Sequence, residues 1–380
     1  MDINIKSKEV KKTSICFVLP TYNEEANIGQ CIESVFSHQN LDQKIIKVLV
    51  VDDNSSDNTQ KIIRELQDQF TELHMIIGEK KGLGDAYKRG FNYSLDQLDP
   101  EVIFQMDADG QHNPSLVPKF LDLIEQGNDL VIGSRFIEGG STPNFSFRRK
   151  LISKIGNLLV RYAGGVRQVK DCTSGYRAIR AAYLKDCDLS FLSTRGYSFQ
   201  SSLLCELMWR GAQAVEIPIE FTSRKGGDSK LSIKDQVEFI LNIPKLGFRN
   251  AEDFIKYSVV GFSGVLVNLG IYMVLTRLFG LSEVIAPLIS IESSLLSNFL
   301  LNNFWTFKKR EVSSSLYKRL LQFHLASGGA ACLNYLTFLL AFAVLGMHDI
   351  LSNLLGITVA AVLNYLINSN WTWRKENGSN

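Results

Sequence analysis

The stretch EVIFQMDADGQHNP (101–114) joins an apolar run to two acids, Asp107 and Asp109, that stand one residue apart. Short apolar runs bounded by turn residues are typical of buried strands. The acids and the following Gly110 fit two explanations. An Asp-Gly pair favours a tight turn after a strand, whereas closely spaced carboxylates suit a hard cation such as Mg²⁺ or Mn²⁺. The surrounding sequence has to distinguish between these explanations.

Strand-like and helix-like segments alternate around this stretch. The strand-like runs are 14–20, 45–53, 73–79 and 101–109, and the segments with helical periodicity are 24–38, 58–70 and 84–96. Such alternation predicts an α/β domain with a mostly parallel sheet. Ligands of these sheets bind beyond the carboxyl ends of the strands. Three predicted strands end in polar motifs, PTYNEE (20–25), VDDNSSDNT (51–59) and DADGQ (107–111).

Each of these motifs has a purely structural explanation when it is taken alone. Asn23 and Glu24 could cap a helix, and the second motif could end a strand in an Asp/Asn turn. One acid would be enough for a cap, however, and Asp52 and Asp53 stand together after a buried run. Three acidic strand ends at one edge of a sheet favour a nucleotide and metal site over three unrelated turns.

The composition differs between the two parts of the chain. Hydrophobic residues make up 45% of the 380 residues and charged residues 21%, but 1–250 has the mixture of a soluble α/β protein whereas 255–373 is mostly apolar. The net charge of +2 gives no reason to expect a nucleic acid partner. We expect no N-terminal signal peptide, because the first apolar run is short. The six cysteines lack metal-type spacing, which indicates reduced thiols in a protein facing the cytosol.

Four apolar segments follow, at about 255–281, 284–307, 319–346 and 350–373. Each is long enough to cross a hydrocarbon core of roughly 30 Å. We therefore expect 255–380 to be an all-α transmembrane domain of four helices. Lysine and arginine residues cluster between the second and third segments and after the fourth. By the positive-inside rule, the catalytic domain and the C-terminus are expected to be cytoplasmic.

The apolar part contains an internal repeat. NNFWTFK (302–308) resembles NSNWTWR (368–374) at an offset of 66 residues, which indicates a tandem duplication of a two-helix unit. Trp305, Trp371 and Trp373 stand near basic residues, so we expect them to be interfacial anchors. 

The second apolar segment contains an acid, Glu292. Acids within a membrane segment are costly and often functional. A hydrogen bond between helices is an equally good explanation for this one.

The segment 144–165 is basic and amphipathic, with Leu151, Ile155, Leu158 and Leu159 close to one face. This pattern predicts a helix on the membrane surface, although an ordinary domain helix has a similar pattern. We assign 1–232 to a catalytic domain and 233–254 to a second interfacial helix or linker.

A set of ordered motifs from about residue 14 to 235 gives a family resemblance. The motifs are VLPTYNEEANI, VDDNSSDNT, KGLGDAY, MDADGQHNP, VIGSRF, RRKLISK, DCTSGYRA, GYSFQ and RKGGDSKLS. They resemble the family 2 glycosyltransferases with the GT-A fold, and within them the polyprenyl-phosphate hexose synthases, typified by dolichol-phosphate mannose synthase. The membrane part resembles the GtrA-like four-helix domain. The resemblance implies inverting, metal-dependent transfer of a hexose, mannose by preference, from GDP-mannose to a polyprenyl or dolichyl phosphate at the cytoplasmic membrane face.

The resemblance also implies which residues form the site. The nucleotide-sugar ligands would be Pro20, Tyr22, Glu24, Val51, Asp53, Asp107, Ala108, Asp109 and Lys230. The ligands of Mg²⁺ or Mn²⁺ would be Asp107, Asp109 and Gln111. The acceptor-phosphate ligands would be Arg135, Arg149, Ser153 and Arg224. The residues with a catalytic role would be Asp109, Arg135 and Arg224. A phosphate acceptor is its own nucleophile, so it needs positioning cations, and arginine binds phosphate well.

Two other functions remain open from the sequence. A polyprenyl-phosphate transferase that uses UDP-glucose or another UDP-hexose would need the same acids and arginines. A flippase for lipid-linked sugars would depend on the membrane part alone. The complete set of acids and arginines favours catalysis, and the absence of a QxxRW motif argues against a processive polysaccharide synthase.

Overall fold

The computed structural model describes residues 12–39, 44–187, 189, 192, 196, 198–222, 233–308, 310 and 312–374. The chain divides into two compact units, Met1–Asn250 and Ala251–Asn380.

The first unit contains eight described α-helices around a sheet. They are α1 (Ile28–Phe36), α2 (Thr59–Gln67), α3 (Leu83–Tyr93), α4 (Val117–Glu125), α5 (Phe147–Ala163), α6 (Ala181–Lys185), α7 (Ser198–Trp209) and α8 (Ile233–Asn250). We expected 233–254 to be a second interfacial helix or linker, and most of this segment forms α8, which belongs to the first unit. It does so because it packs against α5 and α7 and buries Leu246 in the same core.

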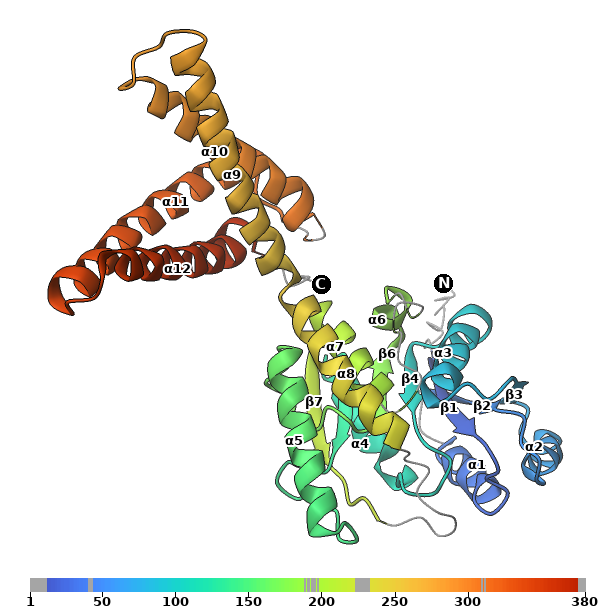
Figure 1. Cartoon of the computed structure of the whole chain (residues 1–380). Helices are drawn as coiled ribbons and strands as arrows, with labels where there is room; N and C mark the ends of the chain where they lie inside the picture. Colours follow the sequence, from blue (N-terminus) through green and yellow to red (C-terminus); the bar gives the residue numbers. More distant parts are fainter. Residues whose placement is uncertain are drawn as a thin grey trace, which may run out of the picture. The chain divides into compact units, whose positions relative to one another are not determined.

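A seven-stranded sheet lies at the centre of the described part of this unit (Figure 1). Its strands are β1 (Thr13–Thr21), β2 (Lys44–Asp52), β3 (Leu73–Ile77), β4 (Val102–Gln105), β5 (Leu130–Ser134), β6 (Arg177–Arg180) and β7 (Ala214–Pro218). Their order is β3-β2-β1-β4-β6-β5-β7. β6 is antiparallel to β4 and β5, whereas the other pairs are parallel. The predicted α/β fold with a mostly parallel sheet is confirmed.

β1 is apolar on both faces because helices cover both sides of the sheet. Cys16 and Val18 pack in the core that α3 and α7 cover, whereas Phe17 and Leu19 pack in the core beneath α1 and α4. Successive strand residues point to opposite faces, so one apolar run supplies both cores. Phe17 also stacks on Phe104 of β4 with ring centroids 4.4 Å apart.

The described part of the second unit is helical and forms two hairpins (Figure 1). Its helices are α9 (Glu252–Arg277), α10 (Ala286–Leu301), α11 (Leu316–Leu339) and α12 (Asp349–Ile367), and the last three continue as single π-helical segments, η4 (Asn302–Thr306), η5 (Leu340–Val344) and η6 (Asn368–Thr372). Within the described residues, three helices are long and apolar enough to cross a membrane: Glu252–Arg277, Leu316–Val344 and Asp349–Thr372. α10 is not among them, because Glu292 and several serine and asparagine residues make its segment more polar.

The internal repeat appears in the structure as two matching helix ends. The hydroxyl of Thr306 donates to Oδ1 of Asn302 at 2.8 Å, and Thr372 makes the same bond with Asn368 at 2.8 Å. Both motifs are π-helical, in η4 and η6. The predicted duplication is therefore confirmed at the level of individual hydrogen bonds.

The expectation that three tryptophans are interfacial anchors is wrong for Trp373. This side chain is fully buried and stacks on Phe307 with ring centroids 4.7 Å apart. Trp305 and Trp371 are 46% and 47% exposed and keep the position of anchors. Trp371 and Trp373 are two residues apart at a helical turn, so they point to nearly opposite sides. Phe307, the repeat counterpart of Trp373, is buried in the same cluster.

A glycine of α3 permits the close approach of that helix to the sheet. A Cβ atom on Gly90 would lie 2.4 Å from Cγ1 of Val18 and 2.9 Å from Cγ2 of Val51. Both neighbours are fully buried strand residues, so neither can move aside easily. In α1, by contrast, a Cβ on Gly29 would make an ordinary contact at 3.5 Å with Cγ2 of Ile62.

These two helical glycines give a matched stability test. Gly90→Ala should lower the free energy of unfolding by roughly 1–3 kcal/mol, because it overpacks the core. Gly29→Ala should leave it unchanged or raise it by up to about 1 kcal/mol, because alanine favours helix. Thermal unfolding of the full chain in detergent, followed by circular dichroism, measures both. An equal response of the two variants would contradict the close packing of α3.

Candidate active site

The carboxyl ends of the parallel strands meet at one edge of the sheet. Thr21 of β1 is paired with Asp52 of β2, and β4 and β5 run in the same direction as these strands. The loops after β1, β2, β4 and β5 therefore lie along one edge. These loops carry Tyr22 and Glu24, Asp53, Asp107 to Gln111, and Arg135, respectively.

The loop after β1 is hydrogen-bonded to the loop after β2. Asn23, with a φ of 52°, accepts the N–H of Ser56 on its Oδ1 at 2.9 Å. Its own N–H donates to Oγ of Ser55 at 2.9 Å, and the N–H of Glu24 donates to Oγ1 of Thr59 at 2.9 Å. The sequence context allowed Asn23 to cap α1, but in the structure Asn23 holds the two loops together instead. This fixes the backbone beside the predicted nucleotide ligands.

The adjacent acids after β2 have different surroundings. Asp52 is fully buried and closes the turn. It accepts hydrogen bonds from Oγ1 of Thr21 (2.9 Å), the N–H of Ser55 (2.9 Å) and Nε2 of Gln60 (2.7 Å). Asp53 instead forms an ion pair with Arg89 of α3. Burial raises the pKa of Asp53, and the charge of Arg89 opposes this rise. Only Asp53 was predicted to bind nucleotide, and Asp52 serves the turn.

Two other predicted nucleotide ligands, Pro20 and Val51, lie opposite each other in the pairing of β1 with β2. The side chain of Val51 is fully buried, so only its backbone can face a ligand. Tyr22 is close to a cation that the sequence interpretation did not include. The ammonium group of Lys80 lies 3.4 Å from the centroid of the Tyr22 ring, which is a cation–π contact.

Asp107 and Asp109 lie in a loop, because β4 ends at Gln105. The sequence interpretation extended this strand to Asp109. The chain turns earlier, with Gly110 at a φ of 74° and the N–H of Gln111 donating to Oδ1 of Asp109 at 3.1 Å. The turn explanation of the motif is therefore correct, and it does not compete with the metal explanation, since the same turn places both carboxylates on one loop.

The negative charge of this loop acts on two neighbouring helices. Burial, followed by the charges of Asp109 and Asp107, raises the pKa of Cys31 in α1 to about 12. Burial and Asp107 also raise the pKa of Tyr87 in α3 well above its usual value. A field of this sign favours binding of a cation.

Arg135 is fixed by a buried carboxylate. Its Nε and Nη2 donate to Asp171 at 2.7 and 2.8 Å, and Nη2 also donates to Oγ1 of Thr173 at 2.8 Å. Burial lowers the pKa of Arg135, but Asp171 more than offsets this effect and raises it overall. Nη1 makes no hydrogen bond to the described residues and is the part of the guanidinium left for a ligand.

Arg149 is connected to Arg135 through two aromatic rings. The guanidinium of Arg149 lies 3.8 Å from the ring centroid of Phe145, and that of Arg135 lies 5.4 Å from Phe221. The two rings meet edge to face with centroids 5.9 Å apart. The structure thus brings two of the predicted acceptor-phosphate ligands into one cluster. Ser153 lies one helical turn after Arg149 in α5, whereas Arg224 and Lys230 lie outside the described residues.

Comparison with known proteins agrees with both units. The family model Glycosyl transferase family 2 matches residues 16–188, and the model GtrA/DPMS, transmembrane domain, matches 256–373. The dolichol-phosphate mannosyltransferase of Pyrococcus furiosus is 34% identical over 366 residues, which cover 94% of this chain and 99% of that protein. The chain belongs to glycosyl transferase family 2.

Two further relatives have similar descriptions. The polyprenol monophosphomannose synthase of Mycolicibacterium smegmatis is 38% identical over 240 residues, covering 62% of this chain and 88% of that protein. The undecaprenyl-phosphate mannosyltransferase of Micrococcus luteus is 35% identical over 235 residues, covering 60% and 92%. The protein is thus a family 2 glycosyltransferase with a GtrA-type membrane domain, as the sequence predicted.

The acidic loop of the enzyme can be tested for its fit to a metal ion. No described lysine or arginine pairs with Asp107, and its Oδ2 lies beside Gly175, where a Cβ would be 3.5 Å away. Nε2 of Gln111 donates to the carbonyl of Thr222 at 2.5 Å, which orients the amide. Among the described residues, no group of three His, Cys, Asp or Glu side chains is arranged around a metal. The two carboxylates and the amide oxygen of Gln111 on one loop are oxygen donors of the kind that hard cations prefer, so the residues fit such an ion.

The sequence interpretation missed the residues that support this loop. The hydroxyl of Tyr87 donates to Oδ1 of Asp107 at 2.8 Å, and the N–H of Asp107 donates to Nδ1 of His112 at 3.0 Å. Tyr87 stands in the quoted motif KGLGDAY and His112 in MDADGQHNP. The motifs thus contained both residues, but nothing in the sequence showed that a tyrosine twenty residues upstream contacts Asp107.

The buried hydroxyl of Tyr87 gives a test of this support. Tyr87→Phe should raise the Mg²⁺ or Mn²⁺ concentration for half-maximal transfer roughly 10- to 100-fold, because ligand-orienting hydrogen bonds tune metal affinity. The matched control is Tyr183→Phe, which removes a hydroxyl that interacts with Asp129, a residue beside the opposite ends of the strands. A metal titration of transferase activity measures both variants. An unchanged midpoint for Tyr87→Phe would exclude this role.

Proposed function

We propose that the enzyme transfers mannose from GDP-mannose to a polyprenyl or dolichyl phosphate at the membrane surface. The observation that carries this proposal is the pairing of an acidic loop, Asp107 to Gln111, with the arginine cluster of Arg135 and Arg149 in the same unit. The acids suit a donor diphosphate with its metal, and the arginines suit an acceptor phosphate. The names of the three relatives, two mannosyltransferases and a monophosphomannose synthase, support mannose as the sugar.

On the donor side, we assign the nucleotide to the joined loops after β1 and β2. Tyr22, with Lys80 over its ring, and Glu24 would line it, and Asp53 would accept hydrogen bonds from the base or ribose. Asp107, Asp109 and Gln111 would hold Mg²⁺ or Mn²⁺ next to Ala108, with Lys230 at the donor phosphates. When bound, the metal ion neutralises charge on the leaving nucleoside diphosphate.

On the acceptor side, the enzyme has to position an anion beside an anionic donor. The second pKa of a phosphate monoester is about 6, so the acceptor is mostly ionised at neutral pH and needs no strong general base. Nη1 of Arg135 has no described partner, and Asp171 fixes the guanidinium through its other nitrogens. We expect Arg149, Ser153 and Arg224 to complete the phosphate site. Attack opposite the leaving diphosphate then inverts the anomeric carbon.

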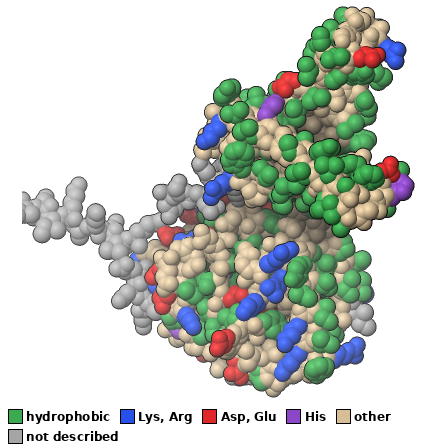
Figure 2. Space-filling model, turned by 90° about the vertical axis from the view of Figure 1, so that its left-hand side faces the viewer, with side chains coloured by type: hydrophobic (Ala, Val, Ile, Leu, Met, Phe, Trp, Pro, Cys, Tyr) green, Lys and Arg blue, Asp and Glu red, His purple; other side chains and the backbone are tan. Residues whose placement is uncertain are grey.

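The helices α5 and α8 would hold the acceptor end of the enzyme at the bilayer. They pack on each other and expose apolar side chains, Phe147, Leu151, Ile152, Ile155, Leu158, Leu159 and Tyr162 on α5 and Val237, Ile240, Leu241 and Phe248 on α8. Figure 2 shows hydrophobic side chains beside lysine and arginine on the face of the first unit where α5 lies. A basic helix with an exposed apolar face is typical of membrane-surface helices.

We propose four membrane spans, with α10 and η4 as the second. Oε1 of Glu292 in α10 lies 3.1 Å from Nε2 of His324 in α11. This contact supports the explanation of Glu292 as a helix–helix hydrogen bond, which offsets the cost of an acid in the bilayer. The basic residues after η4 and after η6 support a cytoplasmic catalytic unit and C-terminus under the positive-inside rule.

The donor and the metal can be tested in one assay. The purified full chain is offered labelled GDP-mannose or UDP-glucose with a polyprenyl phosphate and Mg²⁺, Mn²⁺ or EDTA. We expect product with GDP-mannose, none with EDTA, and a loss of kcat of about 100-fold or more for Asp109→Asn. The control is Asp122→Asn, an exposed acid of α4, which should retain full activity. Product from UDP-glucose alone would replace mannose by glucose, and a fully active Asp109→Asn would exclude the metal assignment.

The membrane role of α5 has a separate test. Ile155→Asn with Leu159→Asn should lower transfer to a long-chain polyprenyl phosphate in vesicles roughly 10-fold, because the variant loses apolar burial at the bilayer. Transfer to a short, water-soluble acceptor should stay unchanged. Ile77→Asn, at an exposed apolar position of β3, is the control. Equal loss with both acceptors would show a folding defect instead of an interfacial role.

A further inference from the structure

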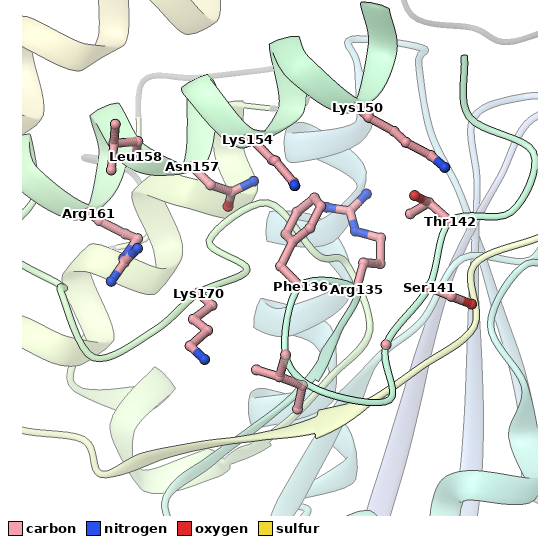
Figure 3. A pocket seen from close by; sticks show the side chains of 12 residues that line it. Arg135, Phe136, Ser141, Thr142, Lys150, Lys154, Asn157, Leu158, Arg161 and Lys170 are labelled. Carbon is pink, nitrogen blue, oxygen red and sulfur yellow. The ribbon is translucent and has the colours of Figure 1, made fainter. Parts of the chain in front are cut away.

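The first unit contains a cationic pocket that includes Arg135 of the proposed acceptor site and extends beyond that site. It is an open cavity of about 530 Å³ between α5 and the segment after β5. Its cationic lining residues are Arg135, Lys150, Lys154, Arg161 and Lys170, and its lining includes no acid. Figure 3 shows the lysine side chains of α5 extending into the space beside Arg135 and Thr142.

Most of this positive charge has no described counterion. Asp171 neutralises Arg135, and Arg161 donates to the carbonyl of Arg167 at 2.8 Å. The ammonium groups of Lys150, Lys154 and Lys170 form no ion pair with the described residues. Lys150 and Lys154 are also one helical turn apart, where like charges destabilise a helix. An anion in the pocket would remove this repulsion.

Two lysines of the pocket lie on a different flank of α5 from the predicted acceptor ligands Arg149 and Ser153. Arg149 and Ser153 precede the two lysines by one residue each, so they project about 100° away around the helix. Gly156, one turn after Ser153, faces α8, since a Cβ there would lie 3.2 Å from Phe239. The lysines face the segment after β5 instead. The two anion sites would share Arg135, and Asn157 of the pocket lies one turn after Ser153.

An apolar wall of the pocket continues into the exposed face of α5. Leu158 lines the pocket and is 47% exposed, and Leu151 and Ile155 are exposed to a similar degree on the same helix. A ligand that fits this surface has an anionic group for the lysines and an apolar chain for the leucines. Inorganic phosphate or a free nucleotide would leave the apolar wall in water.

We infer that this pocket binds the phosphate group of an anionic phospholipid, whose acyl chains lie along the apolar face of α5. The inference rests on the proposed contact of α5 with the bilayer. Basic residues near a membrane surface attract anionic lipids with about 1 kcal/mol each. Such a lipid would hold α5 at the interface beside the acceptor without taking part in the reaction.

Native mass spectrometry of the full chain in detergent tests this site. Phosphatidylglycerol, phosphatidylcholine with the same acyl chains, and inorganic phosphate are added separately. We expect binding of phosphatidylglycerol over phosphatidylcholine, and affinity for phosphatidylglycerol about 30-fold weaker in Lys150→Gln with Lys154→Gln. The control of equal charge change is Lys61→Gln with Lys119→Gln, two exposed lysines of α2 and α4, which should bind like the unmodified chain.

Three results would overturn the inference. One is equal affinity for phosphatidylglycerol in the Lys150 and Lys154 variant and in the control. The second is equal binding of the two phospholipids, and the third is displacement of phosphatidylglycerol by millimolar inorganic phosphate, which would indicate a site for free phosphate. Transfer from GDP-mannose to a short acceptor is measured on the same samples. If the variant loses lipid binding but keeps its transfer activity, the lipid site is separate from the reaction. If the unmodified chain shows no transfer, the proposed function is wrong, but the result for lipid binding still stands.

Discussion

The parallel pairing of β1 with β2 and β4 is the interaction on which the site depends. This pairing puts the carboxyl ends of the strands at one edge, so that loops from distant parts of the sequence become neighbours. Hydrogen bonds from Asn23 to the next loop then fix the spacing at that edge. Close packing of α3 through Gly90 brings Tyr87 to Asp107 and Arg89 to Asp53. A looser helix would leave both acids without the partners that orient them.

The candidate site has an acidic loop and a separate arginine cluster, and neighbouring residues hold the side chains of each in place. The proposed transfer between two phosphate-bearing substrates would need negative charge where a donor with its metal ion binds and positive charge where the acceptor binds. Asp107 is supported by a neutral hydroxyl, that of Tyr87, at 2.8 Å. Arg135 is held by Asp171 on one side, so its orientation is fixed while one nitrogen stays available. Two aromatic rings, Phe145 and Phe221, pack against each other and against the cations of Arg149 and Arg135.

The membrane unit uses the same local device twice. The Asn–Thr hydrogen bonds of η4 and η6 show that the duplicated motif has kept its conformation. The two copies differ in the aromatic residue that they bury, which is Phe307 in the first copy and Trp373 in the second. Both lie in one cluster with Phe299 and Phe323. Arg310 joins the helix ends, because it pairs with Asp253 at 2.7 Å and donates to the carbonyls of Ser369 and Trp373. A basic residue of this region is therefore a structural link as well as a topological signal.

The sequence by itself determined the features that depend on local patterns. Alternating strand and helix periodicity gave the mostly parallel sheet, acidic strand ends indicated a candidate site, and the offset of 66 residues indicated the duplication. Only the tertiary structure decided which side chain serves which partner. Asp52 and Asp53 are identical neighbours in sequence, yet one closes a turn and the other pairs with Arg89. Trp371 and Trp373 are the same residue type and stand in the same motif, yet only Trp373 is buried. Such differences depend on the direction of each side chain and on the element packed against it, and residues far away in the sequence supply that element.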